Sequence, residues 1–491
     1  METLQRTANR GSVSTGGYEI SNSIMFSSLG TYADANSLFY NQIATSDGWA
    51  ANSNAGTNAR KLTVSCWFKR TALTESSHYP RLFDYRAGGV AFAVYFTTSD
   101  QLQMYDDNTS MNLISNQVFR DLSAWYHIVV QIDSTQATAS DRVNVYINGE
   151  KITSWATEDY GNQNVDLSAF RTTGVYNYIG SAAFDYSTAF NGYIAEYHFI
   201  DGSTVAHTEF GETDSDSGIW KPKEYTGSYG TLGHYYNFSD STDMGEDFSG
   251  NNNDSNNRGS GITNGAARQA TDTPTNNFAT FNPLWNYAYN LTISDGASKL
   301  TGSQNQWQGA KGSVGLQNGR WYWEVKIPDA NNGGFTGIQT QGESNIGSGN
   351  AQSNNSTYCR KGDGNDIFYY GGSESTSSHG GGNMANDNII GVFLDLESST
   401  KTLRWFKNGS SYGSTIDLAS KSTSFTTREV FPFYATYGSY EAQFNLGGYG
   451  VYTISSSQSD ANGYGTFEYS PNDGTYDYYA ICTKNLAKYG G

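Results

Sequence analysis

Apolar and polar side chains alternate along much of this chain with the period of a β-strand. Between residues 62 and 69, every second side chain is apolar or sulfur-containing: Leu62, Val64, Cys66 and Phe68. Such a repeat places these side chains on one face of a strand and the intervening ones on the other. Similar alternation occurs at Val90–Phe96, Tyr126–Asp133, Arg142–Ile147 and Gly192–Ile200. No stretch has the period of an amphipathic helix, so the pattern predicts an all-β protein.

Turn signals separate the strand patterns. Asn148-Gly149 follows the pattern at Arg142–Ile147 and precedes a short one at Lys151–Thr153, and Asn-Gly favours the backbone angles of a two-residue hairpin. A second series begins near Asn290 and contains GRWYWEVKI, FTGIQT, DIFYY, NIIGVFLDL, KTLRWFKNG, VFPFYATY and YEAQFNLG. Short strands joined by tight turns are typical of β-sandwiches. We therefore expect two antiparallel β-sandwiches in tandem, joined by a long polar linker.

Polar stretches set the predicted domain boundaries. The prediction is an N-terminal arm (1–21), a first sandwich (22–205), a linker or packing segment (206–289), a second sandwich (290–450) and a Tyr-rich C-terminal extension (451–491) that ends in a polar tail. The Asn/Ser/Gly/Asp run at 249–261 is too polar to bury a core of its own. The linker also contains Trp220, Tyr225, Tyr235 and Tyr236, more aromatic surface than a solvated linker needs. These aromatic residues predict contact with a neighbouring surface.

The composition distinguishes a folded chain from a disordered one. Of the 491 residues, 37% are hydrophobic and 15% charged, values that border on those of disordered proteins. However, 37 Tyr, 25 Phe and 10 Trp supply an aromatic content that disordered chains lack. Gly (55) far outnumbers Pro (7), which suits short strands and tight turns. We expect an aromatic core and a polar, mostly uncharged surface.

Charge and hydropathy exclude several kinds of partner and location. Lys and Arg number 29 against 47 Asp and Glu, a net charge of −18, and the basic residues are scattered singly, so we expect no nucleic-acid binding. No run of about 18 apolar residues occurs, so we expect no membrane insertion. The first residues lack the apolar core of a Sec signal peptide. The three cysteines, Cys66, Cys359 and Cys482, fit no zinc spacing and no disulfide framework, which agrees with folding in a reducing cytoplasm.

Motifs in each half carry a resemblance to a known fold. In the first half these are SAWYHIVV (123–130), VNVYING (143–149), YIG (178–180) and FNGYIAE (190–196), which in this order resemble the laminin-G/pentraxin-type concanavalin-like sandwich. In the second half, GRWYWEV (319–325), GVFLD (391–395), LRWFKNG (403–409), FPF (431–433) and FNLG (444–447) resemble a SPRY domain. The last motif departs from that family, which more often closes with Asn-Phe-Gly. Both resemblances imply a two-sheet sandwich.

The order of the two domains, with the polar segment between them, resembles structural proteins of tailed bacteriophages, especially marine ones. This resemblance implies a protein of the virion surface that is synthesised in the host cytoplasm and released by lysis. Its expected partners are other virion proteins and a host cell-surface glycan. We also expect a homo-oligomer, a trimer by analogy with phage fibres, in which the arm at 1–20 lies on another subunit or on the capsid or tail.

One acidic cluster has the composition of a glycosidase site. Glu212–Asp216 (ETDSD) comes close to the Glu-x-Asp-x-Glu pattern of concanavalin-fold glycoside hydrolases, whose retaining members hold two carboxylates about 5–5.5 Å apart. Here the third acid is Asp, and Gly211 and Gly218 flank the segment as in a turn, which favours a solvated loop. The six histidines include no pair at metal-ligand spacing and none beside a nucleophile-elbow serine. We therefore predict no catalytic residues.

Two groups of side chains are candidates for ligand binding. Asp106 and Asp107 could hold calcium, which prefers clustered carboxylate and amide oxygens, and many laminin-G-like domains hold calcium at their rim. Asp240, Asp243 and Asp247 form a similar group, and for both the alternative is ordinary turn acids in an acidic protein. The candidates for glycan stacking are Tyr369, Tyr370, Tyr434, Tyr437 and Tyr440, for which the alternative is packing in a core or subunit interface.

Three hypotheses about function follow. The leading one is a non-enzymatic phage virion surface protein, either a tail or head fibre or a decoration subunit, that acts in assembly and host-surface attachment. The alternative is a glycan-binding adhesin whose main role is host recognition. The third is a glycanase that uses the Glu212 cluster.

Overall fold

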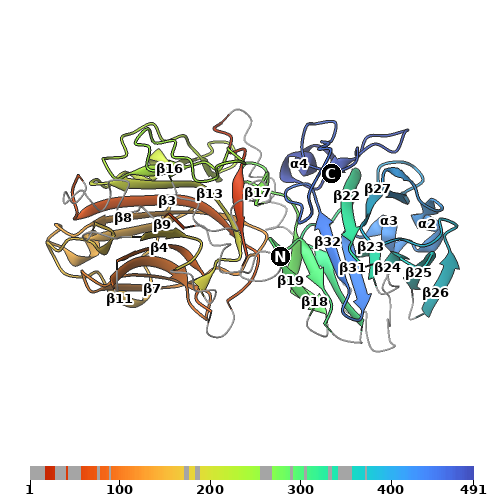
Figure 1. Cartoon of the computed structure of the whole chain (residues 1–491), viewed down its shortest axis with the longest axis horizontal. Helices are drawn as coiled ribbons and strands as arrows, with labels where there is room; N and C mark the ends of the chain where they lie inside the picture. Colours follow the sequence, from red (N-terminus) through yellow and green to blue (C-terminus); the bar gives the residue numbers. More distant parts are fainter. Residues whose placement is uncertain are drawn as a thin grey trace. The chain divides into compact units, whose positions relative to one another are not determined.

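The computed structural model describes residues 17–27, 40–41, 57–74, 78–87, 90–170, 176–182, 188–254, 268–287, 291–303, 307–329, 334–340, 357–370 and 373–490. The described residues divide into two compact units, 17–275 and 276–490. We call them the N-terminal unit and the C-terminal unit (Figure 1). Strands account for 46% of the structure and helices for 7%, with antiparallel sheets in both units, so the predicted all-β fold is confirmed.

Two sheets form the N-terminal unit. Sheet A runs in the order β10 (Glu150–Lys151), β9 (Val143–Ile147), β8 (Trp125–Asp133), β3 (Lys61–Arg70), β13 (Gly192–Asp201), β1 (Ser23–Phe26) and β17 (Gln269–Ala270), and β16 (His234–Tyr236) also pairs with β13. Sheet B runs in the order β11 (Trp155–Asp159), β7 (Met111–Val118), β6 (Gln101–Asp106), β5 (Val90–Phe96), β4 (Arg81–Ala87), β12 (Tyr176–Ile179) and β2 (Tyr40–Asn41). Short 3-10 helices lie at Ala139–Asp141, Ser168–Phe170 and His207–Glu209.

The predicted alternation builds the core between sheets A and B. Val64, Cys66 and Phe68 of β3 lie with apolar residues of β4 to β6 in one buried cluster. The predicted hairpin joins β9 to β10, and both turn residues have positive φ, 49° at Asn148 and 82° at Gly149. Such angles define the tight turn that an Asn-Gly pair favours. The period-two strands and this turn were therefore predictable from local sequence.

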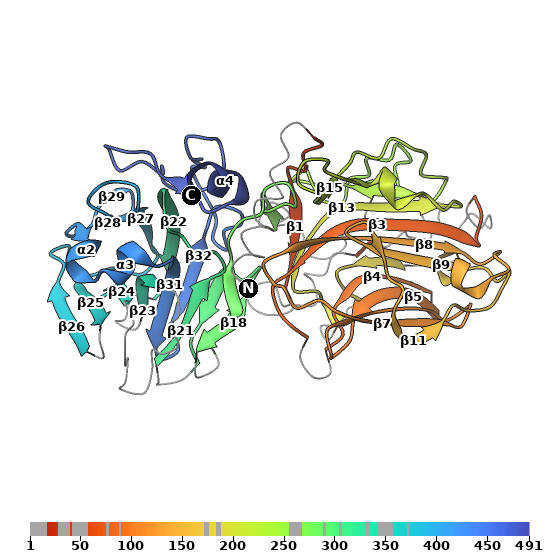
Figure 2. The same ribbon diagram turned by 180° about the vertical axis from the view of Figure 1, so that it is seen from behind.

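The central strands of sheet A, β8, β3 and β13, are buried on both faces, which the alternation alone does not predict. We call residues 207–236 the cover. Its hairpin of β14 (Gly211–Thr213) and β15 (Trp220–Pro222) lies on the outer face of sheet A, and its last strand, β16, joins sheet A by pairing with β13. Figure 2 shows β15 beside β13 and β3, on the side of sheet A away from β4, β5 and β7. As a result β3 shows no exposed side. Near its end the Lys69 ammonium is buried as well, 2.7 Å from the Asp272 carboxylate, which lies outside the cover.

Two further sheets form the C-terminal unit. Sheet C runs in the order β18 (Phe281–Tyr287), β21 (Trp307–Gly312), β31 (Val430–Tyr437), β23 (Gly334–Thr340), β24 (Thr357–Lys361), β25 (Asn365–Tyr370) and β26 (Ser373–Ser378). Sheet D runs in the order β19 (Thr292–Ser294), β20 (Lys299–Thr301), β32 (Glu441–Asn445), β22 (Arg320–Ile327), β27 (Asn388–Asp395), β28 (Thr402–Lys407) and β29 (Ser410–Ser411). At its margins, β30 (Ile416–Asp417) pairs with β28 and β33 (Tyr479–Ala480) pairs in parallel with β22. The short helices are α2 (Leu418–Lys421), α3 (Ser424–Thr427) and α4 (Thr483–Tyr489).

A buried carboxylate attaches the C-terminal extension to sheet D. Glu324 of β22 accepts hydrogen bonds from the hydroxyls of Tyr322 (2.8 Å) and Tyr452 (2.7 Å). It also accepts them from the backbone N–H groups of Glu468 (2.9 Å) and Tyr469 (2.8 Å). Towards the end of the extension the chain forms helix α4, whose Leu486 and Tyr489 pack against the core of this unit.

Several expectations about the arm and the linker change with the structure. Residues 1–16 lie outside the described ranges, but Tyr18 and Ile20 pack on the N-terminal unit of their own chain rather than on a partner, since Ile20 and Thr275 exchange hydrogen bonds. The segment predicted as a linker is divided, its part through Thr275 belonging to the N-terminal unit and its part from Asn276 to the C-terminal unit. Among the described residues, no helix has the length and apolar character needed to cross a membrane.

Candidate functional site

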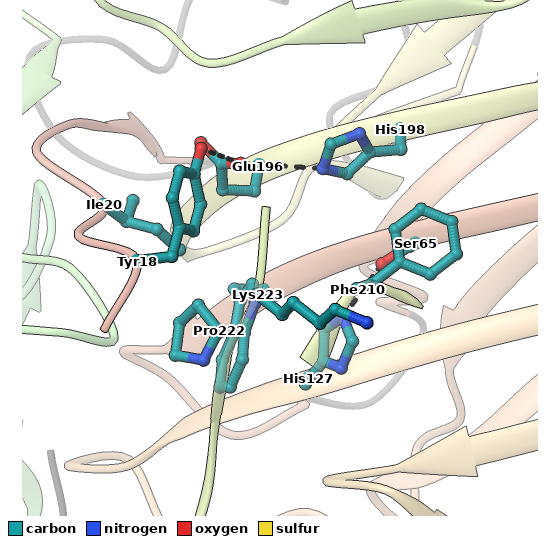
Figure 3. A pocket seen from close by; sticks show the side chains of 10 residues that line it. Tyr18, Ile20, Ser65, His127, Glu196, His198, Phe210, Pro222 and Lys223 are labelled. Carbon is teal, nitrogen blue, oxygen red and sulfur yellow. Dashed lines mark hydrogen bonds and ion pairs between the residues drawn. The ribbon is translucent and has the colours of Figure 1, made fainter. Parts of the chain in front are cut away.

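Polar and aromatic side chains gather between the outer face of sheet A and the cover. Ser65, His127 and His198 point outward from β3, β8 and β13, because their neighbours in sequence point into the sandwich core. Tyr18, Phe210, Pro222 and Lys223 close the cluster from the other side (Figure 3). Because a serine, two histidines and a carboxylate meet here, the chemistry of this cluster decides between a catalytic and a structural role.

A serine and a histidine are hydrogen-bonded here, which the sequence analysis did not foresee. Ser65 Oγ lies 2.8 Å from His127 Nε2, and Trp220 Nε1 lies 2.9 Å from His127 Nδ1. An indole N–H only donates, so Nδ1 of His127 accepts and the ring proton resides on Nε2, from which it is donated to Ser65. Burial, with added repulsion from His198 and His207, lowers the pKa of His127 to about 3. The imidazole is therefore neutral and carries its proton on the side facing Ser65, so it cannot act as a base toward that hydroxyl.

A β-bulge places Glu196 in the same cluster. The register between β13 and β3 shifts between Ala195 and His198, and Glu196 has a φ of 49°. Its carboxylate accepts hydrogen bonds from the hydroxyls of Tyr18 (2.9 Å) and Tyr235 (2.7 and 2.8 Å). Burial and the Glu196 charge raise the pKa of both tyrosines, so both remain neutral donors. The bulge thus ties the start of the chain and β16 to one buried carboxylate.

His198 completes the network. Its Nδ1 lies 2.9 Å from the Tyr229 hydroxyl, its Nε2 lies 3.6 Å from Glu196, and its ring stacks on Tyr235 with centroids 4.3 Å apart. In Figure 3, Glu196 lies between Tyr18 and His198. The recess lined by the cluster is shallow and has essentially no interior space that a water molecule could occupy. Small-molecule pockets usually have roughly 300 Å³ or more, so the cluster fixes the cover rather than holding a ligand.

The acidic cluster proposed as a glycosidase motif lies in the β14–β15 hairpin. Lys221 Nζ is 3.2 Å from both Glu212 and Asp214, and half of the Glu212 side chain is exposed. Hydrogen bonds from Ser217, with the Lys221 contact, lower the pKa of Asp214 to about 2. A general acid needs a raised pKa, whereas the pKa of Asp214 is lowered. Both carboxylates neutralise one lysine.

The aspartates predicted as calcium ligands bind backbone groups instead of facing one another. Asp106 is buried and accepts hydrogen bonds of 2.8 Å from the N–H groups of Thr109 and Ser168, while Asp107 accepts one of 2.8 Å from Ala91 N–H. Asp247 similarly accepts backbone N–H groups, from Tyr235 of β16 and from Ser249 and Asn253 of its own loop. Among the described residues, no group of three or more His, Cys, Asp or Glu side chains could hold a metal ion.

The tyrosines predicted to stack on glycans do not form one platform. Tyr434 is fully buried in the core of the C-terminal unit, so it is not available to a ligand. Tyr437 is 48% exposed and Tyr440 is half-buried. The side chains of Tyr369 and Tyr370 lie outside the described part of the chain.

Sequence reasoning also missed Glu196, although the chain contains a signal for it. The inward-facing residues Ile194, Tyr197 and Phe199 are spaced by three and then by two positions, and an interrupted alternation of this kind indicates a bulge.

The four aromatic residues of the predicted linker make their contacts within the N-terminal unit. Trp220 stacks with His127 and His207, and Tyr225 stacks with Phe210. Tyr235 and Tyr236 belong to β16, which pairs with β13. They therefore no longer argue for an oligomer.

Comparison with known families finds one match in each unit. Residues 44–207 match the model of the concanavalin A-like lectin/glucanases superfamily that describes laminin-G-like domains, and residues 320–449 match the SPRY domain model. The chain therefore contains a laminin-G-like and a SPRY domain, kinds of domain that typically bind partners without catalysis. A search of curated proteins finds no match.

Solved structures resemble parts of the chain. The SPRY domain of human HERC1 has 17% identity over 33% of this chain and 96% of its own, with a TM-score of 0.26. The heptameric SAP-like pentraxin from Limulus polyphemus has 15% identity over 39% of this chain and 82% of its own, with a TM-score of 0.28. Domains LG4-5 of the mouse laminin alpha1 chain have 9% identity over 88% of this chain and 90% of their own, with a TM-score of 0.28.

Proposed function

We propose that this protein is a non-catalytic binding protein of a tailed-phage virion surface, a fibre or decoration subunit that acts in assembly and host-surface attachment. The observation that carries the non-catalytic part is the state of His127. Trp220 and Ser65 engage both of its ring nitrogens, with the proton on the nitrogen that faces Ser65. The one Ser–His contact of the sheet A cluster is thus a fixed structural contact.

The virion part of the proposal rests on the order of the domains and on the surface chemistry. A laminin-G-like sandwich followed by a polar segment and a SPRY domain resembles phage structural proteins, as the motifs above indicate. The three cysteines are free and buried, which suits a protein that folds in a reducing host cytoplasm. In this proposal the chain is made there and then carried on the particle surface.

The proposal includes a homo-oligomer and contacts with other virion proteins. Support comes from open strand edges, because β26 of sheet C and β11 of sheet B each end their sheet in the described residues. Edge strands of this kind pair with further strands or with partners. We expect a trimer by analogy with phage fibres, and sedimentation of the purified chain at micromolar concentration is the direct measurement. A monomer, both free and when extracted from particles, would contradict this part.

Immunogold electron microscopy tests the proposal as a whole. Antibodies raised against the full chain should label gradient-purified particles of the phage that carries the gene, at regular positions on their surface. Particles stripped of the chain should adsorb to host cells more slowly. The proposal fails if the chain remains in the soluble lysate and purified particles carry no label.

A sugar-release assay tests the glycanase alternative separately. The wild-type chain and Glu212→Gln should release the same background of reducing ends from host polysaccharide, since Glu212 serves Lys221 in a hairpin. Release by the wild type that the substitution abolishes would overturn the non-catalytic proposal.

A further inference from the structure

The hairpin of the cover is attached to sheet A less firmly than the rest of the cover. β16 pairs with β13, but β14 and β15 form a two-stranded sheet that pairs with no other strand in the described part of the chain. We call residues 207–223, which contain this hairpin, the strap. An isolated two-stranded hairpin is at best marginally stable in water, so the strap depends on the surface on which it lies.

Backbone hydrogen bonds fix the chain to sheet A on either side of the strap. Before it, the N–H of Val205 donates to Thr63 Oγ1 of β3 at 2.8 Å. After it, the carbonyl of Tyr229 accepts from the N–H of Asp201 of β13, also at 2.8 Å. The strap therefore has fixed ends, and its movement need not disturb β13 or β16.

Between these ends, few contacts hold the strap on sheet A. Among the described residues, its one hydrogen bond to the sheet is the bond of 2.9 Å from Trp220 Nε1 to His127 Nδ1. The other contacts are made by rings: His207 stacks on Tyr146, with centroids 3.9 Å apart, and Phe210 is buried among apolar residues of β8 and β13. Of these contacts, only the hydrogen bond requires a particular nitrogen to be free of a proton.

The bond between Trp220 and His127 and a second proton on His127 exclude one another. The neutral ring carries its proton on Nε2, which donates to Ser65, so a second proton has to bind Nδ1. There it would face the indole N–H of Trp220, and two donors form no hydrogen bond. Doubly protonated His127 therefore requires Trp220, and the strap with it, to leave.

The closed strap disfavours this proton. Burial, with repulsion from His198 of β13 and His207 of the strap, lowers the pKa of His127 to about 3. When the strap lifts, water reaches the ring, and the pKa of an exposed histidine is about 6.5. Between these two values the open state binds a proton and the closed state does not, so acid favours the open state.

Other charged groups near His127 interact with partners of their own: Glu196 with His198, Glu150 with His207, and Lys223 with Glu209. The described residues thus give a proton on His127 no carboxylate partner that would hold the charged ring in the closed state.

We propose that the strap opens as one unit when acid breaks the Trp220–His127 bond, while sheet A stays folded beneath it. Opening would uncover Ser65, Trp67 and His127, all of which are buried in the closed state. At pH 5 the strap should open about thirty-fold more often than at pH 8, because the exposed ring is then protonated. This inference goes beyond the proposed function, since it requires neither a partner nor a virion.

Hydrogen exchange of the full chain at pH 8 and pH 5, read by mass spectrometry and corrected for the intrinsic effect of pH, tests the inference. At both pH values the amides of the strap should exchange at least about ten-fold faster than those of β3 and β8, because local opening exposes the strap alone. The opening of the strap should rise about thirty-fold from pH 8 to pH 5. Strap amides that exchange as slowly as those of β3 and β8 at both pH values would overturn the inference.

Two variants separate His127 from the rest of the hairpin, with circular dichroism and melting temperature as checks that each is folded. His127→Gln keeps an acceptor for Trp220 but does not titrate, so the pH effect on the strap should fall to about five-fold or less. Lys221→Gln, next to Trp220, removes ion pairs within the hairpin alone and is the matched control, which should keep the full pH effect. A larger pH effect in folded His127→Gln, or the same loss in Lys221→Gln, would overturn the role of His127.

Discussion

Trp220 donates a hydrogen bond of 2.9 Å from its indole nitrogen to Nδ1 of His127, across 93 residues of sequence. The bond links the cover to strand β8 of sheet A and fixes the tautomer of the imidazole. The ring of Trp67 stacks on the same imidazole, with centroids 4.6 Å apart. The hydrogen bond to His127 therefore forms only when the cover is packed on sheet A.

Trp220→Phe should destabilise the N-terminal unit by roughly 1–3 kcal/mol, because it leaves the buried Nδ1 of His127 without a donor. Urea unfolding of the full chain, followed by circular dichroism, measures the change. Trp155→Phe is the control, since Trp155 is half-buried like Trp220 but lies at the edge of sheet B, away from His127, and should cost less. Equal costs for the two substitutions would show that the His127 bond contributes nothing.

The stability of the N-terminal unit should fall as the pH drops below about 6.5, the pKa of an unfolded histidine. Burial lowers the pKa of His127 to about 3, and that of His234 to about 4 against the attraction of Asp247. The unfolded state therefore binds protons first, and each histidine costs about 1.4 kcal/mol of unfolding free energy per pH unit until its folded pKa is reached.

Urea unfolding at pH 8, 7, 6 and 5 measures this dependence. Between pH 8 and 7 the unfolding free energy should change little, since an unfolded histidine is already mostly neutral there. His127→Gln keeps an acceptor for Trp220 but does not titrate, so the decline from pH 6 to 5 should become shallower. An unchanged decline in this variant would show that His127 is protonated in the folded state.

The strands and the tight turns were predictable because they depend on short sequence patterns. The alternation in β3 and the Asn148-Gly149 turn depend on neighbouring residues, and the Asn408-Gly409 turn repeats the same device, with φ of 49° and 76°. In both turns the Asn side chain accepts a backbone N–H of an adjacent strand, from His127 and from Ile389. Strand alternation and Asn-Gly turns depend on residues that are close in sequence, so a short stretch of sequence is enough to predict them.

Contacts between distant segments explain what was missed. The burial of Lys69 depends on Asp272, 203 residues away, and no periodicity in β3 indicates it. The Arg81–Tyr105 contact depends on the register of three strands and on the small side chain of Ala93. The basic residues seemed scattered in sequence, and only strand pairing shows that Arg81 and Arg86 converge on Asp84.

Glu324→Gln should loosen the C-terminal extension. The carboxylate accepts four hydrogen bonds, and an amide would turn one of its oxygens into a donor that faces other donors. We expect a loss of roughly 2–4 kcal/mol in the C-terminal unit. Hydrogen exchange at the amides of Glu468 and Tyr469 should accelerate. Glu441→Gln, on the neighbouring β32 with a quarter of its side chain exposed, is the control and should leave these amides protected.

Gly149→Ala should destabilise the N-terminal unit more than Gly218→Ala does. Both glycines have similar positive φ, 82° and 73°, so both substitutions carry the strain of a left-handed residue, about 1–2 kcal/mol. A Cβ at Gly149 would also lie 2.6 Å from Cζ3 of Trp220, whereas one at Gly218 would meet nothing within 4 Å.

The difference between the two unfolding free energies therefore isolates the contact between the β9–β10 turn and the cover. We expect Gly149→Ala to cost about 1–3 kcal/mol more, as overpacking of a rigid site usually does. It should also weaken the Trp220–His127 bond, so hydrogen exchange in β15 should accelerate in Gly149→Ala and not in Gly218→Ala. Equal stabilities and equal exchange would mean that Trp220 does not pack on this turn in solution.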